Sequence, residues 1–278
     1  MRKRHGGVLG IAQPLHTLHL YGAAGVASFG WALSRLLAFP CDRLLPLWFF
    51  GALLVYNLDR LKHDPADALN TPERLRQHGR LRAVSIALVV ISALLLVALP
   101  VLADDPLLLL LTAAAALVSL SYSFQLFGFR CKDLPAIKTL FAPTIVLGAY
   151  LLPSWIRGAL PLDAHFASAA AWSLCLLMFN MVLCDLRDIV GDRAVGTKSI
   201  PVLLGEKSTR RLLLVLLGLQ FILALANGWV LLGCLSVIYL AALLLAIRTR
   251  QREGFYEWFV EGILFLPAVT EAWKHFAG

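Results

Sequence analysis

The sequence predicts an all-α protein, a multi-pass transmembrane bundle of about nine helices. Hydrophobic residues make up 59% of the 278-residue chain and charged residues only 15%, and the mean hydropathy is +0.77, well above that of soluble domains. Apolar stretches of membrane-spanning length recur along the chain, and Lys and Arg collect between them in alternate loops. No linker rich in Pro, Gly or Ser interrupts residues 1–278, so we expect a single membrane domain.

Each expected helix corresponds to one apolar stretch. The third, fourth, seventh and eighth stretches are the clearest, whereas the first contains Arg35, the fifth contains Pro143, and the ninth carries Glu257, Glu261 and Glu271. The nine stretches cover approximately residues 18–39, 43–61, 83–102, 106–125, 136–153, 166–186, 210–227, 229–247 and 255–273.

The distribution of basic residues sets the orientation. With the N-terminus inside the cell, 21 of the 25 Lys and Arg residues fall in cytosolic segments, as the positive-inside rule requires. An N-in, C-out chain of nine helices gives this alternation, because one helix more or fewer would reverse every later loop. We therefore expect a protein integral to the cytoplasmic (inner) membrane, in which the net charge of +8 reflects topology and not nucleic-acid binding.

The cysteines and the N-terminus indicate no further chemistry. The five cysteines are scattered, without CxxC or Cys/His ligand spacing, and are expected to act as small hydrophobic residues. The basic start, Met1–His5, is followed by a segment too polar for the core of a signal peptide, so no cleaved segment is expected.

Three carboxylates mark the end of the sixth apolar stretch. Asp185 and Asp188 would lie about 60° apart on a helix, and Asp185 and Asp192 about 20° apart, so all three share one face. An uncompensated Asp costs roughly 3 kcal/mol at the centre of a membrane helix and is by default a functional hypothesis. Solvated side chains paired with loop arginines are the alternative, but three carboxylates on one face favour a bound cation.

A second acidic segment follows the second helix. The second and sixth helices both run from outside to inside, so the two acidic segments should meet at the cytosolic side, and the chain has the pattern of a weak four-helix repeat followed by a ninth helix. Mg²⁺ binds through one or two carboxylates, water and substrate phosphate oxygens, and Lys and Arg hold the remaining phosphate charge. The pattern therefore predicts a site for Mg²⁺ and a polyphosphate. The polar residues of this segment are Asn57, Asp59, Asp64 and Asp67.

The segment around the second cluster resembles a known family. Residues 185–193 (DLRDIVGDR) followed by residues 196–205 (GTKSIPVLLG) are closely similar to the second Asp-rich motif of the UbiA superfamily of intramembrane prenyltransferases. Tyr122-Ser123 with Arg130 and Lys132, after the fourth helix, resembles the family's Tyr/Lys segment. Helix number and spacing extend the resemblance over nearly the whole chain.

The resemblance implies a Mg²⁺-dependent prenyltransferase, which moves a prenyl group from an isoprenoid diphosphate to a lipophilic acceptor within the membrane. Mg²⁺ and basic side chains would stabilise the departing diphosphate. The expected Mg²⁺ ligands are Asp64, Asp67, Asp185, Asp188 and Asp192. The residues expected to bind the diphosphate are Asn57, Arg60, Arg130, Lys132, Arg193 and Lys198. Those expected to act in catalysis are Asp64, Tyr122, Asp188 and Asp192.

The first acidic segment departs from the family's Asn-x-x-x-Asp-x-x-x-Asp pattern. Counting from Asn57 finds no carboxylate at either expected position. If the helix continues to residue 64, Asn57 and Asp64 lie about 20° apart and share a face, while Pro65 is expected to end the helix and leave Asp67 in the loop. The other register, equally open, is Asp59, His63 and Asp67.

Two alternatives to prenyl transfer remain open. One is different chemistry on the same scaffold, either phosphoribosyl transfer to a polyprenyl phosphate or terpene cyclisation; the other is a non-catalytic isoprenoid-binding or transport protein. The sequence disfavours CDP-alcohol phosphotransferases, because Asp185 is followed by Leu-Arg and not by their Asp-Gly-x-x-Ala-Arg element. In the ninth helix, Glu257 and Glu261 either line the cavity as an acceptor-binding or proton-accepting pair, or one of them reaches the cytosolic interface while the other pairs with Arg248, Arg250 or Arg252.

Overall fold

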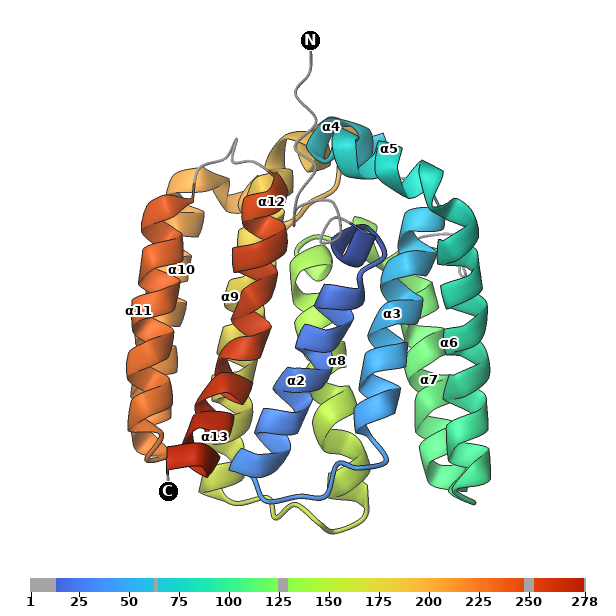
Figure 1. Ribbon diagram of the computed structural model, residues 1–278. Helices are drawn as coiled ribbons and strands as arrows, with labels where there is room; N and C mark the ends of the chain where they lie inside the picture. Colours follow the sequence, from blue (N-terminus) through green and yellow to red (C-terminus); the bar gives the residue numbers. More distant parts are fainter. Residues whose placement is uncertain (1–13, 63–64, 125–129, 248–252, 278) are drawn as a thin grey trace.

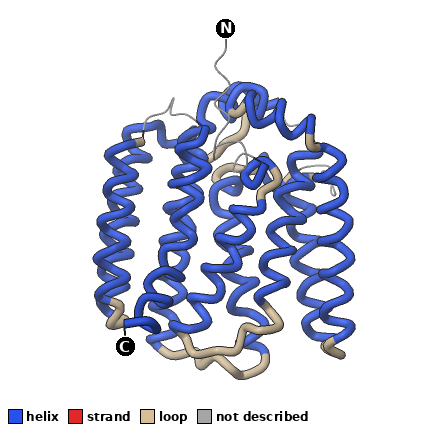
Figure 2. Tube along the Cα trace, in the orientation of Figure 1, coloured by secondary structure: helices blue, strands red, loops and turns tan. Residues whose placement is uncertain are grey.

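The computed structural model describes residues 14–62, 65–124, 130–247 and 253–277. Regular secondary structure in these residues is entirely helical, without a strand (Figure 2). The prediction of an all-α protein is confirmed.

Each of the nine expected membrane stretches is matched by a helix in the described residues. The ninth is built from consecutive pieces: α12 (Glu253–Phe255), a π-helical segment η2 (Tyr256–Val260), a 3₁₀ segment η3 (Glu261–Phe265) and α13 (Leu266–Ala277). The other eight are α2 (Leu20–Leu36), α3 (Leu45–Leu61), α6 (Arg82–Leu102), α7 (Pro106–Ser123), α8 (Ile137–Ile156), α9 (Ala164–Val195), α10 (Ile200–Ala226) and α11 (Val230–Ala246).

Local sequence accounts for several helix ends. The Asp105 side chain accepts a hydrogen bond from Leu108 N (3.0 Å) and caps α7, and Asp163 accepts one from Phe166 N (2.7 Å) and caps α9. α9 ends at Gly196, whose φ of 80° is a left-handed conformation that glycine adopts without strain. By length and composition, α6, α8, α9 and α10 can each cross a membrane.

Two helices extend beyond the expected apolar stretches. α9 continues to Val195 instead of ending near residue 186, so the whole second acidic cluster is helical. α10 begins at Ile200 instead of near residue 210, with a non-helical break at Gly205. Hydropathy marks the apolar part of a helix, and the charged turns that continue it carry no such signal.

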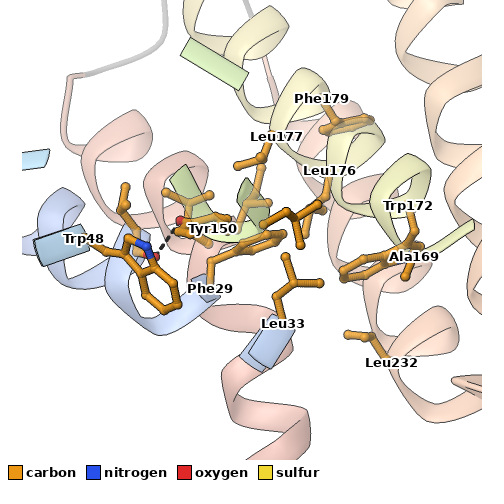
Figure 3. Packing of buried hydrophobic residues seen from close by; sticks show 14 of the residues in the cluster. Phe29, Leu33, Trp48, Tyr150, Ala169, Trp172, Leu176, Leu177, Phe179 and Leu232 are labelled. Carbon is orange, nitrogen blue, oxygen red and sulfur yellow. Dashed lines mark hydrogen bonds between the residues drawn. The ribbon is translucent and has the colours of Figure 1, made fainter. Parts of the chain in front are cut away.

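Aromatic side chains fill the middle of the bundle. Phe29 of α2 stacks between Tyr150 of α8 and Trp172 of α9, with ring centroids 5.6 and 6.2 Å away (Figure 3). Tyr150 and Trp172 are fully buried, and the Tyr150 hydroxyl donates to a backbone carbonyl of α2. A Cβ at Gly30 would lie 2.4 Å from the Trp48 ring, so this glycine permits the close approach of α2 and α3. These contacts fix the four helices that surround the site.

Two short helices, α4 (Pro65–Asn70) and α5 (Pro72–Arg80), lie across one end of the bundle (Figure 1). α2 begins toward this end, and α13 lies at the opposite end (Figure 1). Both acidic segments of the sequence lie here, and we call it the acidic end.

Candidate active site

The carboxylates of α9 face α8 at the acidic end. Lys138, near the start of α8, places its Nζ 2.6 and 2.7 Å from the two carboxylate oxygens of Asp192 and 3.4 Å from Asp185 Oδ1. The Thr139 hydroxyl donates to Asp185 Oδ2 at 2.5 Å. Asp185 and Asp192 are both buried. One ammonium group therefore compensates two carboxylates whose burial alone would be strongly destabilising.

Asp188 lies beside these two carboxylates but has a different partner. Arg187 donates to both of its carboxylate oxygens, at 2.7 and 3.0 Å. The Arg187 guanidinium also lies over the ring of Tyr256, 5.1 Å from the centroid. The three carboxylates of the predicted face thus divide between two cations, Lys138 and Arg187.

Lys138 is the residue of this site that the sequence analysis missed, since it was counted only among the cytosolic charges. A signal was present, because Lys138 lies inside the expected fifth membrane helix, residues 136–153. A basic residue within a membrane helix points to function as strongly as an acidic one does.

The first acidic segment does not form a continuous helical face. α3 ends at Leu61, short of residue 64, and both His63 and Asp64 lie outside the described residues. Asn57 is fully buried, and its Nδ2 donates to two backbone carbonyls, each at 2.9 Å. Its Oδ1 is buried and has no hydrogen-bond partner among the described residues. Asp59 is partly buried on the same helix.

The expectation that Asp67 lies in a loop is wrong. Pro65 begins the short helix α4, which contains Asp67, because the fixed φ of proline suits the first turn of a helix. Arg60, expected to bind the diphosphate, is instead 2.6 Å from Asp67 Oδ2 in an ion pair.

α4 joins the two acidic segments. Asn70, its last residue, accepts a hydrogen bond from the backbone N–H of Gly191 at 2.8 Å. A Cβ at position 191 would lie 2.4 Å from Asn70 Oδ1, so this contact requires glycine. Gly191 lies between Asp188 and Asp192, and the contact therefore holds the first segment against the second cluster.

The segment after the fourth helix lies beside Lys138. The Tyr122 ring stacks on Phe141, with centroids 4.7 Å apart, and Phe141 is one helical turn from Lys138 on α8. Arg130, expected to bind the diphosphate, donates two hydrogen bonds to Asp133, both at 2.8 Å. Tyr122 is therefore placed near the second cluster, while Arg130 is engaged within its own turn.

The other predicted diphosphate ligands differ in exposure. Lys132 is buried, in the 3₁₀ turn η1 (Cys131–Asp133), whereas the side chains of Arg193 and Lys198 are exposed. The Lys198 carbonyl accepts a hydrogen bond from Ala136 N at 2.8 Å and ties the loop after α9 to the start of α8.

Sequence comparison places this site in a family. Residues 47–255, more than half of the chain, match the UbiA prenyltransferase family. The chain belongs to this family. A digeranylgeranylglyceryl phosphate synthase of Natronomonas pharaonis is 30% identical over 191 residues, which are 65% of this chain and 62% of that protein. A protein of the same name from Pyrococcus furiosus is 28% identical over 85 residues, 30% of this chain and 28% of the relative. The chain thus spans less than two thirds of either relative.

Solved structures of the family have the same fold. The chain is similar to a UbiA homolog from Archaeoglobus fulgidus bound to GPP and Mg²⁺, with a TM-score of 0.63, 12% identity, and coverage of 93% of this chain and 98% of that one. It is also similar to a structure reported for digeranylgeranylglyceryl phosphate synthase in membranes, with a TM-score of 0.51, 15% identity, and coverage of 95% and 99%. The predicted UbiA-like helical fold is confirmed.

The side chains at the acidic end suit Mg²⁺. No three His, Cys, Asp or Glu side chains converge as a metal site within the described residues, but Mg²⁺ needs only one or two carboxylates when substrate phosphates complete its coordination. Asp185 Oδ1 is buried without a hydrogen-bond partner in this described part. The Lys138 ammonium already lies where a cation is needed, within ion-pair distance of Asp185 and Asp192.

Proposed function

We propose that this protein transfers a prenyl group from an isoprenoid diphosphate to a lipophilic acceptor within the membrane, in a Mg²⁺-dependent reaction. The observation that carries the proposal is the ion-pair cluster of Lys138 with the buried Asp185 and Asp192 at one end of a UbiA-type bundle. Buried ion pairs contribute little net stability, and charges inside a membrane bundle mark functional sites. We infer that the cluster binds a cation and a polyanion.

The residues around the cluster have complementary tasks. Asp185 and Asp192 would hold Mg²⁺, which when bound neutralises the charge that develops on the leaving diphosphate. Lys138 contacts these two carboxylates and Arg187 contacts the neighbouring Asp188, and both basic groups would bind phosphate oxygens once the metal is bound. The stacked ring of Tyr122 would face the allylic cation, since an aromatic face stabilises a cation by about 0.5–2 kcal/mol.

For the acceptor, the names of the relatives favour a prenylated glyceryl phosphate, whose attacking atom is a hydroxyl oxygen. The distribution of Lys and Arg, 21 of 25 on one side under the nine-helix topology, supports a cytosolic position for the acidic end and hence for both acidic segments. The diphosphate would then enter from the cytosol while both hydrocarbon chains remain in the bilayer.

The test is product formation by the purified protein in lipid vesicles. Geranylgeranyl diphosphate and geranylgeranylglyceryl phosphate are supplied with Mg²⁺ or with excess EDTA, and a membrane lipid extract replaces the acceptor in a parallel series. We expect a prenylated product by mass spectrometry and pyrophosphate release, both only with Mg²⁺. Tight Mg²⁺-dependent binding of the diphosphate without pyrophosphate release with any acceptor would show a binding protein and overturn the proposal.

A further inference from the structure

A second polar cluster lies next to the acidic end, where η2 and η3 of the ninth helix meet α5 and the residues before α2. Arg74 of α5 places Nη2 3.7 Å from Glu261 Oε1 and Nε 3.9 Å from Glu257 Oε1, and Nη2 is also 3.1 Å from His19 Nδ1. Both ring nitrogens of the buried His16, and Glu261 Oε2, lack hydrogen-bond partners among the described residues. Unpaired buried polar atoms cost free energy, so the cluster is built for something other than stability.

Glu261 is the member of the cluster that packs against a glycine of α2. A Cβ at Gly22 of α2 would lie 3.3 Å from Glu261 Oε2 and 3.5 Å from the Tyr56 ring, so the missing side chain at Gly22 leaves the room that the buried Oε2 occupies, while the Glu261 side chain as a whole keeps 20% of its exposure. Tyr56 precedes Asn57, which links this space to the first acidic segment. The ninth helix is π-helical immediately before Glu261, and such departures from α geometry are frequent at functional sites.

The depth of Glu261 in the bundle fits chemistry at the prenyl chain. Asn180 Nδ2 donates to the carbonyl of Val260 at 2.6 Å, so Glu261 is level with the turn of α9 that precedes Asp185. Five residues of α-helix rise about 7.5 Å. A diphosphate held by Asp185 and Asp192 at the acidic end must direct its prenyl chain into the apolar interior, which brings the first carbon of that chain toward the level of Glu261.

We propose that Glu261 is the general base of the reaction, held by Arg74, and accepts the proton of the acceptor hydroxyl; this inference rests on the proposed prenyl transfer. The allylic C–O bond of the isoprenoid diphosphate breaks, and its electron pair leaves with the diphosphate. The acceptor oxygen forms a bond to that carbon, and its proton passes to Glu261 Oε2. Glu261 becomes neutral and later releases the proton to water, while Arg74 keeps its charge throughout.

Glu261→Gln tests the proposal because it keeps the size of the side chain and removes its basicity. We expect the rate of transfer from geranylgeranyl diphosphate to geranylgeranylglyceryl phosphate to fall at least about 100-fold, since a general base contributes about 10²- to 10⁴-fold. Mg²⁺-dependent binding of geranylgeranyl thiolodiphosphate should stay within about twofold. Glu271→Gln is the matched control on the same helix, because Glu271 pairs with Lys274 in α13, far from this cluster, and its transfer rate should equal that of the wild type.

Three results would overturn the assignment. Transfer by Glu261→Gln within about threefold of wild type excludes a base of ordinary strength, and loss of thiolodiphosphate binding shows that the residue only supports the site. An equal loss in Glu257→Gln shows that the pair serves to hold Arg74. Failure of the wild-type protein to transfer at all contradicts the proposed function instead.

A second variant keeps the test valid if Glu261→Gln does not fold. Gly22→Ala leaves every charge in place but puts a methyl group 3.3 Å from Glu261 Oε2. The KM for the acceptor should rise with thiolodiphosphate binding retained, and an unchanged KM counts against an acceptor in this space.

Discussion

The two acidic segments of this protein reach the same end of the bundle by different routes. In the second, Asp185, Asp188 and Asp192 lie on one continuous helix, α9, so their spacing in the sequence converts directly into directions in space. In the first, α3 ends at Leu61 and α4 begins at Pro65, so the spacing crosses a break. The angular spacing of residues around a helix therefore predicts how the side chains of the second cluster lie, but it cannot be applied to the first segment.

The segments also differ in the surroundings of their charges. Asp185 and Asp192 are buried and share Lys138. Asp67 pairs with Arg60, and the side chains of these two residues are 20% and 14% exposed. Removing one partner of a buried pair costs about 3–5 kcal/mol, while pairs nearer to solvent contribute about 0–1 kcal/mol. We therefore expect the loss of Asp192 to change the electrostatic energy of the site more than the loss of Asp67 does.

The largest effect should come from removing charge in the second segment. Asp192→Asn keeps the side-chain size, removes a predicted Mg²⁺ ligand and leaves Lys138 facing a neutral amide. We expect Mg²⁺-dependent transfer to fall at least about 100-fold. Asp67→Asn, the matching change in the first segment, should lower it by less than about tenfold. Both rates are measured in vesicles across a Mg²⁺ titration.

The same pair of variants can break the comparison. If Asp67→Asn is as damaging as Asp192→Asn, the first segment holds the metal as strongly as the second. The register formed by Asp59, His63 and Asp67 would then gain support, and Asp59→Asn should be damaging as well. Melting temperatures of the variants separate loss of function from loss of fold.

A smaller effect is expected where the segments touch. Gly191→Ala would place a methyl group 2.4 Å from Asn70 Oδ1 and push α4 away from α9. We expect transfer to fall by about tenfold, since a small misplacement of ligands can cost up to about 10²-fold. Asn70→Ala removes the obstructing side chain, so the double variant should recover part of the lost activity. A double variant worse than Gly191→Ala alone would show that the hydrogen bond, and not the spacing, matters.

The sequence was sufficient for features that the membrane and the helix impose together. Hydropathy predicted nine apolar stretches, each of which is helical in the described residues, because a segment that crosses a membrane must bury its backbone in a helix about 20 residues long. The 3.6-residue period predicted that the carboxylates of α9 share a face, and the structure places Asp185 and Asp192 on one lysine, with Asp188 beside them.

Contacts between distant segments were beyond the reach of periodicity. Lys138 and Asp192 are 54 residues apart, and Arg74 reaches Glu257 and Glu261 from a helix that follows α3. A local pattern gives the direction of a side chain around its own helix, but not which other helix stands in that direction. For the same reason the sequence left two roles open for the glutamates of the ninth helix. Arg248, Arg250 and Arg252, their expected partners, lie outside the described residues, and the structure places both glutamates near Arg74 of α5.

The smallest effect should appear on acidification. The contact between α5 and the residues before α2 should weaken at a higher pH than the start of α8 does. Burial and the nearby charge of Arg74 lower the pKa of His16 to about 4. Because an exposed His has a pKa of about 6.5, an opened form takes up protons between about pH 6.5 and pH 4 that the closed form does not. The contact of α5 with the His16 segment is therefore fully stable above pH 6.5 and weakens as the pH falls through this window.

Hydrogen exchange measured between pH 7 and pH 4.5, corrected for intrinsic rates, distinguishes the two regions. Protection of the amides in α5 should decrease on acidification, while protection at the start of α8 should hold, because the described residues in contact with Lys138 include no histidine. His16→Gln cannot take up the proton and should lose part of the pH dependence at α5. An equal loss of protection at α5 and α8, or an unchanged pH profile in His16→Gln, would mean that acid acts on carboxylates in each of the two regions. His16 would then have no separate part in holding α5 in place.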